Sequence, residues 1–386
     1  GGAVYDEGDL TIQNCNIINN TADYGGGIYN YTNSACTIID STISSNTATN
    51  YGGGIAINGT CTITNSTITS NTTKYGGGIS NDGSCTFTDS NINSNTASQH
   101  GGGIYNVGTC TVNGSAINNN TATSYGGGIY NYNTGTCTVT DSNIENNISH
   151  IGGGITNDGT CTVTDSTITS NTTEYGGGIY NYINSTFTVT DSDINNNTAP
   201  QGGGIFNFYG TLNVSGCNFE SNQASYGNAI YNYSGDTSTQ VVQFCRFYDQ
   251  ADGYEIYCYH GTVDAQYNWW GSNSDPSSKV WGDVDVSPWL VLNIADASPI
   301  FIGKNGSSNI TANLWYDSDG NYHNPTSEHI ADGIPIIFYS TIGIVYSPIS
   351  TTNGSAVSTL IPNSVSGKAD IFAILDDQYL QTSVII

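Results

Sequence analysis

Apolar residues recur in three columns along the first two thirds of the chain, with a period of about 25 residues. The second column lies two residues after the first, and the third lies seven residues after it. The first column opens a short segment in each repeat and consists of Leu10, Cys36, Cys61, Cys85, Cys110, Cys137, Cys161, Phe187, Leu212 and Val263. One repeat fits less well and places Gln240, Val242 and Phe247 in the three columns. Since Thr mostly separates the first two columns, the alternation predicts a half-buried strand.

Turn residues separate these segments. Asp-Ser, Asn-Ser or Gly-Ser lies between the second and third columns. Each repeat also carries a glycine block, Gly-Gly-Gly-Ile, and three glycines at one corner indicate positive φ or a close backbone approach. The intact blocks begin at Gly25, Gly52, Gly76, Gly101, Gly126, Gly152, Gly176 and Gly202. Degenerate copies begin at Gly1, Gly227 and Gly253. No segment shows a helical period of useful length.

A repeat of short strands and turns at this period is typical of a solenoid, in which each coil buries its apolar face only against its neighbours. The predicted fold class is all-β: a right-handed parallel β-helix with three short sheets, followed by an Ig-like β-sandwich. With strands roughly 4.8 Å apart, ten coils give a rod about 50 Å long.

An asparagine recurs three residues after the third column. Stacked amides can hydrogen-bond along the axis and tolerate left-handed turns, which favours a structural role. The column consists of Asn20, Asn46, Asn71, Asn95, Asn120, Asn147, Asn171, Asn197 and Asn222. The alternative is glycosylation, because several of these residues lie in N-x-S/T sequons. Better glycosylation candidates lie outside the repeats, at Asn305, Asn309 and Asn353.

The repeat frame, the cysteines and the tryptophans all change near residue 268. The repeats occupy residues 1–268, and residues 269–290 read as a Trp-rich cap and linker that covers the last coil. Residues 291–386 alternate in short runs between Asn-Gly, Asp-Gly and Pro turns, which predicts the sandwich. The chain also opens inside a coil, which suggests a mature fragment of a longer protein.

Charge excludes some partners. The net charge is −26, and the chain has only five Lys and Arg residues. Such a surface repels phosphate backbones and anionic membranes, so nucleic acid is not an expected partner. No run of 18 apolar residues and no signal segment is present, so no membrane insertion is expected. The acidic, Thr- and Asn-rich composition suits an extracellular protein.

The ten cysteines allow several states. Six form an inward-facing ladder from Cys36 to Cys161, and in-register parallel strands point their Cβ atoms the same way, which strains a disulfide. We therefore expect a row of buried, reduced thiols. Cys217 and Cys245 lie in a different, turn-adjacent column and form the best disulfide candidate. A metal site in the ladder is not expected, since no CxxC or Cys/His spacing is present.

Enzymatic chemistry on polysaccharides would need converging carboxylates. Asp141, Asp165 and Asp191 stack on successive coils, but each occupies the same Asp-Ser turn, so the repetition indicates a structural role. We expect no catalytic residue and no bound cofactor. Asp317, Asp319 and Asn321 resemble the opening of a calcium loop, yet the glycine stands at position 4 and not 6, which favours a surface turn.

Tyrosines flank the glycine corner in most coils. Stacking along a β-helix face is the favoured interpretation, and the alternative is a platform for sugar rings or a protein partner. The tyrosines before the corner are Tyr24, Tyr51, Tyr75, Tyr125, Tyr175 and Tyr226. Those after it are Tyr29, Tyr105, Tyr130, Tyr180, Tyr231 and Tyr257.

The chain resembles a known family at these residues. The alternation of Gly-Gly-Gly-Ile with segments such as Ile68 to Asn71 is similar to polymorphic outer-membrane-protein repeats. With the Asn-Trp-Trp-Gly cap from Asn268 to Gly271, it resembles the adhesin-like surface proteins of methanogenic archaea. Segments such as Asp332 to Pro335 are similar to invasin-type Ig-like domains. The resemblance implies cell-surface display and an anaerobic setting that keeps thiols reduced.

The predicted function is therefore a cell-surface adhesin-like or fibre-forming structural protein that displays an exposed binding face. The alternative is a carbohydrate-binding or polysaccharide-cleaving β-helix. Expected partners are other cell surfaces, glycans or copies of the chain itself. An open first coil would be covered by an upstream segment or would receive a strand from another copy, giving a head-to-tail homopolymer.

Overall fold

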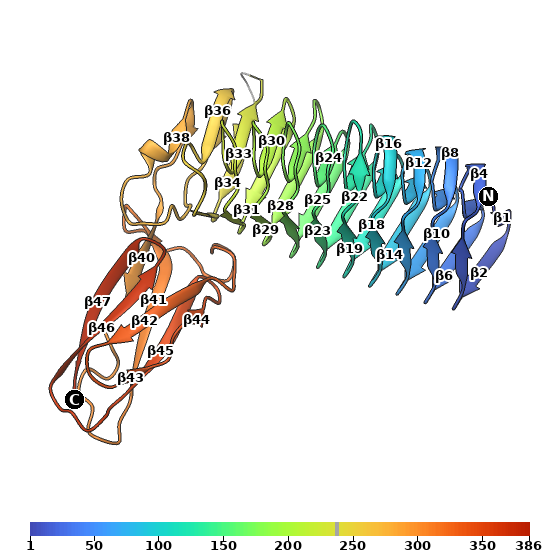
Figure 1. Cartoon of the computed structure of the whole chain (residues 1–386). Helices are drawn as coiled ribbons and strands as arrows, with labels where there is room; N and C mark the ends of the chain where they lie inside the picture. Colours follow the sequence, from blue (N-terminus) through green and yellow to red (C-terminus); the bar gives the residue numbers. More distant parts are fainter. Residues whose placement is uncertain (236–238) are drawn as a thin grey trace.

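The computed structural model describes residues 1–235 and 239–386 and is all-β apart from one short 3-10 helix, η1 (Ser277–Lys279). A parallel β-solenoid is followed by a small domain of antiparallel sheets, which confirms the predicted fold class (Figure 1). In Figure 1 the solenoid is a rod, and the small domain projects from its C-terminal end at an angle.

Three long parallel sheets run the length of the solenoid, and each strand pairs with the equivalent strand of the next coil. The tyrosine sheet consists of β1 (Val4–Asp6), β5 (Ile28–Asn30), β9 (Ile55–Ile57), β13 (Ile79–Asn81), β17 (Ile104–Asn106), β21 (Ile129–Asn131), β24 (Ile155–Asn157), β27 (Ile179–Asn181), β30 (Ile205–Phe208), β33 (Ile230–Tyr233), β36 (Ile256–His260) and β38 (Val280–Trp281). The cysteine sheet consists of β2 (Asp9–Gln13), β6 (Ala35–Ile39), β10 (Thr60–Thr64), β14 (Ser84–Thr88), β18 (Thr109–Asn113), β22 (Thr136–Thr140), β25 (Thr160–Thr164), β28 (Thr186–Thr190), β31 (Thr211–Ser215), β34 (Thr239–Gln243), β37 (Thr262–Asp264) and β39 (Val284–Asp285). The isoleucine sheet consists of β3 (Asn16–Ile18), β7 (Thr42–Ser44), β11 (Thr67–Thr69), β15 (Asn91–Asn93), β19 (Ala116–Asn118), β23 (Asn143–Glu145), β26 (Thr167–Thr169), β29 (Asp193–Asn195), β32 (Asn218–Glu220) and β35 (Arg246–Tyr248).

A fourth, shorter sheet lies at the corner before the glycine block, so the expectation of three sheets is wrong for the first coils. This corner sheet consists of β4 (Thr21–Tyr24), β8 (Thr47–Tyr51), β12 (Thr72–Tyr75), β16 (Thr96–His100) and β20 (Thr121–Ala122). Its register shifts between neighbouring strands, as between Thr73 and Tyr75. Because a shifted register breaks the period of two, this segment carries no alternating pattern that marks it as a strand.

The apolar columns meet in one continuous core along the rod. In-register pairing places Cys61 beside Cys85 and Ile63 beside Phe87, and all four side chains are buried. The predicted inward register is confirmed, including the poorly fitting repeat, where Val242 pairs with Val214 and Phe247 with Phe219. Gln240 is also buried, and its Oε1 accepts a hydrogen bond from the Leu212 N–H at 2.6 Å.

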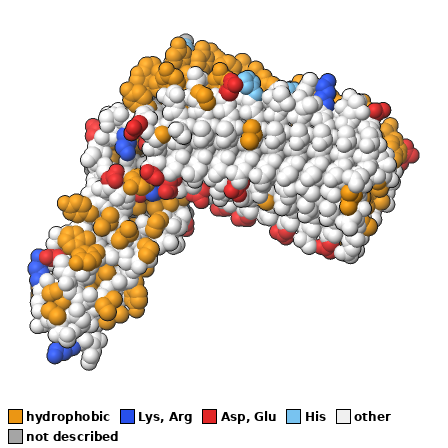
Figure 2. All heavy atoms as spheres, viewed as in Figure 1, with side chains coloured by type: hydrophobic (Ala, Val, Ile, Leu, Met, Phe, Trp, Pro, Cys, Tyr) orange, Lys and Arg blue, Asp and Glu red, His pale blue; other side chains and the backbone are white. Residues whose placement is uncertain are grey.

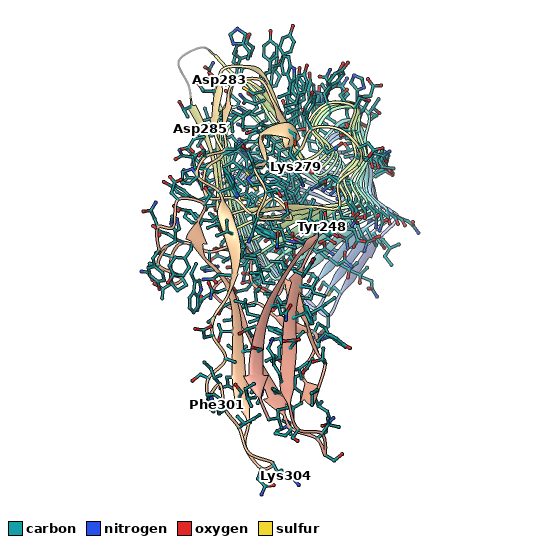
Figure 3. The ribbon with its side chains drawn as sticks, turned by 90° about the vertical axis from the view of Figure 1, so that its left-hand side faces the viewer. Tyr248, Lys279, Asp283, Asp285, Phe301 and Lys304 are labelled. Carbon is teal, nitrogen blue, oxygen red and sulfur yellow. The ribbon has the colours of Figure 1, made fainter. Side chains whose placement is uncertain are left out.

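Two four-stranded antiparallel sheets form the C-terminal domain around its own core. One sheet contains β40 (Leu290–Ile294), β41 (Ser308–Asp317), β45 (Ser355–Ile361) and β43 (Ile344–Val345). The other contains β44 (Ile349–Ser350), β42 (Pro335–Ser340), β46 (Lys368–Leu375) and β47 (Gln378–Ile385). Figure 3 shows Phe301 and Lys304 at the end of this domain that is remote from the rod.

The Trp-rich segment contributes side chains both to the solenoid core and to the core of the C-terminal domain. Trp270 stacks on Phe247 of the last isoleucine-sheet strand, with ring centroids 4.6 Å apart, and closes the solenoid core. Trp269 lies in the core of the C-terminal domain instead. The parallel sheets extend through this segment to β38 and β39, so Trp281 continues the tyrosine sheet and stacks on Tyr257.

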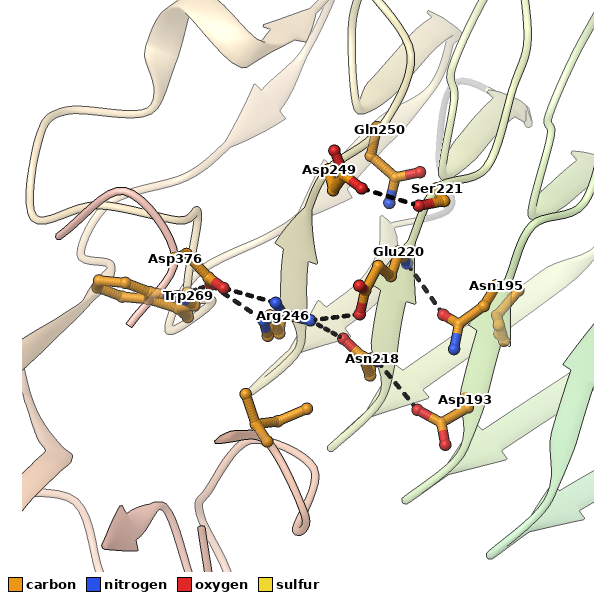
Figure 4. Close-up of polar contacts among 12 residues, drawn as sticks. Asp193, Asn195, Asn218, Glu220, Ser221, Arg246, Asp249, Gln250, Trp269 and Asp376 are labelled. Atoms are coloured by element: carbon orange, nitrogen blue, oxygen red, sulfur yellow. Dashed lines mark hydrogen bonds and ion pairs between the residues drawn. The ribbon is translucent and has the colours of Figure 1, made fainter. Parts of the chain in front are cut away.

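A buried polar network joins the rod to the C-terminal domain (Figure 4). Asp376 of that domain accepts hydrogen bonds from Arg246 Nε at 3.0 Å and from the Trp269 indole N–H at 2.7 Å. The other side of the Arg246 guanidinium contacts Asn218 and Glu220 on the preceding coil. Because the guanidinium is bidentate to Asp376 and buried, it fixes the angle between the two parts.

Candidate binding site

A row of stacked aromatic rings covers the outer face of the tyrosine sheet in the last coils of the rod. In each of these strands the second residue points outward, because the residue before it faces the core and side chains alternate across a strand. These residues pair in register and form the floor row, which consists of Tyr180, Phe206, Tyr231, Tyr257 and Trp281. Successive ring centroids lie 5.0, 4.7, 5.4 and 4.3 Å apart.

Two further rows flank the floor and turn it into a trough. One flank comes from residues just before the glycine corner and consists of Ile151, Tyr175, Gln201 and Tyr226. The other comes from residues two places after the floor, including Phe208, Tyr233 and Tyr259. The trough encloses about 640 Å³, and Figure 2 shows its hydrophobic side chains as a band along the upper edge of the rod.

The trough is uncharged although the molecule is strongly acidic. None of its described lining residues is Asp, Glu, Lys, Arg or His. Burial raises the pKa of Tyr231 to about 12, so its hydroxyl stays protonated at any physiological pH. The acidic side chains gather elsewhere, and Figure 2 shows many of them along the lower edge of the rod. The trough therefore offers aromatic carbon and neutral hydroxyl groups to a ligand.

The glycosylation candidates are accessible. Asn305, Asn309 and Asn353 are all exposed, and Asn309 lies in β41. The sequon asparagines of the repeats, such as Asn71 and Asn147, are instead completely buried in the asparagine ladder. The structure thus agrees with the structural interpretation of the ladder.

The calcium candidates form a turn. Asp317 is buried, and its Oδ1 accepts the backbone N–H groups of Asp319 and Asn321, while its Oδ2 lies 3.1 Å from His323 Nε2. Asp319 and Asn321 are exposed. Among the residues that the structure describes, no group of three or more His, Cys, Asp or Glu side chains is placed to hold a metal ion.

The cysteine candidates are free thiols in the structure. Cys217 and Cys245 are buried on neighbouring coils, but they form no disulfide. The physical reason is the one that applies to the ladder: in-register coils point the two Cβ atoms the same way. Each thiol instead donates to a nearby carbonyl, Cys217 to Ser215 and Cys245 to Gln243. Burial raises the pKa of Cys217 well above that of a free thiol.

The stacked aspartates occupy left-handed turns. Asp141, Asp165 and Asp191 have φ of 47°, 48° and 48°, a conformation that Asp and Asn tolerate better than most residues. Near the C-terminal domain, Asp165 and Asp191 line a hollow of about 270 Å³ with His329 and Asp332. Burial, and then the charge of Asp165, raises the pKa of Asp191.

Sequence reasoning missed half of the trough. The tyrosines on either side of the glycine corner were found, but the second flank and Phe206 of the floor row were not. The signal was present as an aromatic-Asn-aromatic motif in successive coils, at residues 180–182, 206–208 and 231–233. The motif places its two rings outward and its asparagine inward.

Comparison with known proteins gives two weak likenesses. No protein-family model and no curated protein sequence matches this chain. The adhesin InvE of Yersinia pseudotuberculosis is 19% identical over a match that covers 25% of this chain and 26% of InvE, with a TM-score of 0.20. A tailspike protein mutant of E. coli bacteriophage HK620, in complex with a pentasaccharide, is 10% identical over 97% of this chain and 81% of its own, also with a TM-score of 0.20. The chain thus matches about a quarter of the InvE length. Since both TM-scores are low, the functional conclusions depend on the geometry described above.

Within the described residues, no helix is long and apolar enough to cross a membrane.

Proposed function

We propose that this chain is an adhesin-like cell-surface rod without enzymatic activity, which binds a partner through the aromatic trough. The trough is the observation that carries the proposal. Continuous apolar patches of this kind on a protein surface mark interaction sites, whereas isolated exposed apolar residues do not. Surface display agrees with the resemblance of the sequence to the adhesin-like proteins of methanogenic archaea.

The build of the rod supports a role in presentation. Parallel sheets run from the first coil to β38 and β39. Inside the rod, the asparagine ladder joins neighbouring coils through hydrogen bonds. The trough therefore lies on a stiff support, which lowers the entropy cost of binding. The rod–domain network around Arg246 holds the trough at a set angle to the C-terminal domain.

Carbohydrate binding is the second candidate, and the floor row favours it. Tyr180, Phe206, Tyr231 and Tyr257 lie with neighbouring ring planes 15°, 22° and 5° apart. Such a row offers a continuous strip of aromatic ring edges, flanked by the more exposed rings of Tyr226 and Tyr259, to the C–H groups of an extended chain of sugars. The described trough lining holds no carboxylate, so it supports binding of a glycan and not its cleavage.

Binding of the purified chain to an array of neutral and acidic polysaccharides, and to intact cells, tests the proposal. We expect binding to cells or to neutral, extended polysaccharides, weaker binding to polyanions because of the −26 charge, and no release of reducing ends. Binding to neither cells nor any polysaccharide would overturn the adhesin proposal. Release of reducing ends would overturn the non-enzymatic assignment.

A further inference from the structure

A second, smaller cavity lies beside the trough, where the aromatic rows are interrupted. It encloses about 190 Å³. It is lined by Tyr125, Tyr130, Tyr132, Thr156, Asp158 and Tyr182. Four aromatic rings thus surround one carboxyl group.

The repeat register explains why the cavity exists in this coil. Thr156 pairs with Tyr130 on one side and Tyr180 on the other, so a small side chain replaces a ring of the floor row. Asp158 then stands where the neighbouring coils place Tyr132 and Tyr182. Thr156 is itself satisfied, because its hydroxyl donates to the Ile151 carbonyl at 2.8 Å. The missing ring leaves the space, and Asp158 supplies the charge.

The Asp158 carboxylate is half-buried, and no Lys, Arg or His of the described part of the chain pairs with it. Burial raises its pKa, which is partly offset by a hydrogen bond from the Asn133 backbone. None of the ion pairs formed within residues 1–235 and 239–386 involves Asp158. A cation is attracted both to aromatic rings and to a carboxylate, so a cavity lined by four tyrosine rings and Asp158 favours positive charge on two counts.

We propose that this cavity is an aromatic cage that binds an alkylated ammonium group of the choline type. The rings attract the cation through their faces, and Asp158 supplies the countercharge. The same surface already accommodates one ammonium: Lys74 Nζ lies 5.1 Å from the ring centroid of Tyr75. This site is separate from the trough and does not depend on its ligand.

Other ligand classes fit the cavity poorly. An anion would meet Asp158 and the −26 charge of the whole chain. Calcium needs six or more oxygen ligands, and the cavity has a single carboxylate beside tyrosine and threonine hydroxyls. A neutral apolar group would fill the space but would leave the carboxylate desolvated and unpaired.

Isothermal titration of the full chain with choline, and with its uncharged carbon analogue 3,3-dimethylbutan-1-ol, tests the cage. We expect choline to bind about tenfold or more tightly than the analogue, because only choline carries the charge. The variant Asp158→Asn keeps the shape of the side chain and should weaken choline binding by about tenfold as well. Equal binding of the two probes, or no choline binding by the native chain, would overturn the proposal.

The control variant is Asp141→Asn, which removes the same charge from an exposed turn outside the cage. Asn65 occupies the equivalent turn in another coil, so the exchange is compatible with the fold. We expect choline binding to be unchanged in this variant. An equal loss in both variants would mean that net charge attracts choline, which would also contradict the cage.

Co-sedimentation with phosphatidylcholine vesicles separates two sources of the same chemistry. Vesicle binding that Asp158→Asn removes would assign a lipid head group to the cage. Binding of free choline without vesicle binding would assign a small soluble ammonium compound.

Discussion

Asparagine is the residue that joins one coil to the next inside the rod. Asn120 Oδ1 accepts the backbone N–H and the side-chain amide of Asn95, both at 3.0 Å. Its own amide donates to the Ile92 carbonyl and to Asn147 Oδ1. The amide donates two hydrogen bonds here and accepts two, whereas a Ser hydroxyl donates only one and a carboxylate donates none, which explains why Asn occupies this column and not Asp or Ser.

We predict that Asn120→Ala destabilises the rod by about 2 kcal/mol, because it leaves buried donors and acceptors of two neighbouring coils unpaired. Asn113→Thr is the control, since Asn113 is exposed and the next coils carry Thr140 and Thr164 there. It should change stability by less than about 0.5 kcal/mol. Urea unfolding followed by circular dichroism measures both variants, and equal stabilities would contradict the role of the ladder.

A buried acid at the last coils makes stability depend on pH. Glu255 stands two residues after Gly253 where intact corners carry glycine, and its Oε2 has no hydrogen-bond partner among the described residues. Burial raises its pKa from 4.5 to about 7. The folded state therefore keeps a proton that the unfolded chain releases, so this group makes stability fall as pH rises from 4.5 through about 7.

The variant Glu255→Gln should remove this pH-dependent contribution to stability. At pH 8 we expect it to be more stable than the native chain by about 3 kcal/mol, and near pH 4.5 the two should be equal. The measurement is the difference in unfolding free energy between the two proteins across this pH range. The contributions of the other acidic residues are the same in both proteins and therefore cancel in this difference. A difference that does not vary with pH would contradict the burial of a charged Glu255.

The glycine corner sets the closest approach between coils. Gly126 has a φ of 63°, which favours glycine, whereas a Cβ on Gly127 would lie 2.4 Å from the Gly153 carbonyl oxygen of the next coil. The first glycine of the block is thus needed because its backbone has a positive φ, and the second because no room is left for a Cβ atom. The equivalent corner at Gly176 places one flank of the trough beside its floor, since Tyr175 of the flank and Tyr180 of the floor row lie on either side of it.

Gly127→Ala should destabilise the middle of the rod by about 3 kcal/mol through overpacking. Gly8→Ala is the matched control, because a Cβ at Gly8 meets no heavy atom within 4 Å. Hydrogen exchange of the flanking coils is the sharpest readout, since a solenoid can open locally. Unchanged protection around Gly127 would contradict the close approach.

The elements that follow a simple repeating pattern of residues were predicted correctly from the sequence. The alternation around Cys61 and Ile63 fixed a strand and its inward face, and the Asp-Ser turns were read correctly. The corner sheet was missed because its strands shift register, as at Tyr75, and show no alternation. The cage at Asp158 was also missed, because a cavity made by the absence of one ring depends on which coils are neighbours.

At the scale of the whole molecule, two cores meet at one buried charge cluster. Arg246 belongs to β35 of the rod, and Asp376 lies between β46 and β47 of the C-terminal domain. Their side chains are nearly inaccessible, so loss of either partner leaves the other charge without adequate compensation. No pattern in the sequence points to this pair, because its partners lie 130 residues apart.

We predict that Asp376→Asn loosens the junction and costs about 2 kcal/mol in stability of the C-terminal domain. Asn tolerates the left-handed conformation of this residue (φ 52°), so the change leaves the backbone unstrained and removes the charge together with one of the two accepting oxygens. Asp377→Asn, at the exposed neighbouring position, should have no such effect. Small-angle X-ray scattering would show a wider range of rod–domain angles only for the first variant, and identical profiles would refute the prediction.

Assembly into fibres stays a prediction. Light scattering and electron microscopy of the chain at high concentration distinguish end-to-end species from single rods. A strict monomer would leave the adhesin-like rod without polymerisation.

The central claim is that the aromatic trough is the binding face, and variants of its exposed rings test it most directly. Tyr226 and Tyr259 are 47% and 54% exposed, so changing both to Ser removes one exposed ring from each flank of the trough with little effect on the core. The matched control changes Tyr339 and Tyr379 to Ser, which are 58% and 66% exposed on the C-terminal domain. Binding of each protein to the cells or polysaccharide that the native chain recognises is the measurement. We expect at least a tenfold loss for the trough variant, about 1.4 kcal/mol, and none for the control. Native-like binding by the trough variant would contradict the claim.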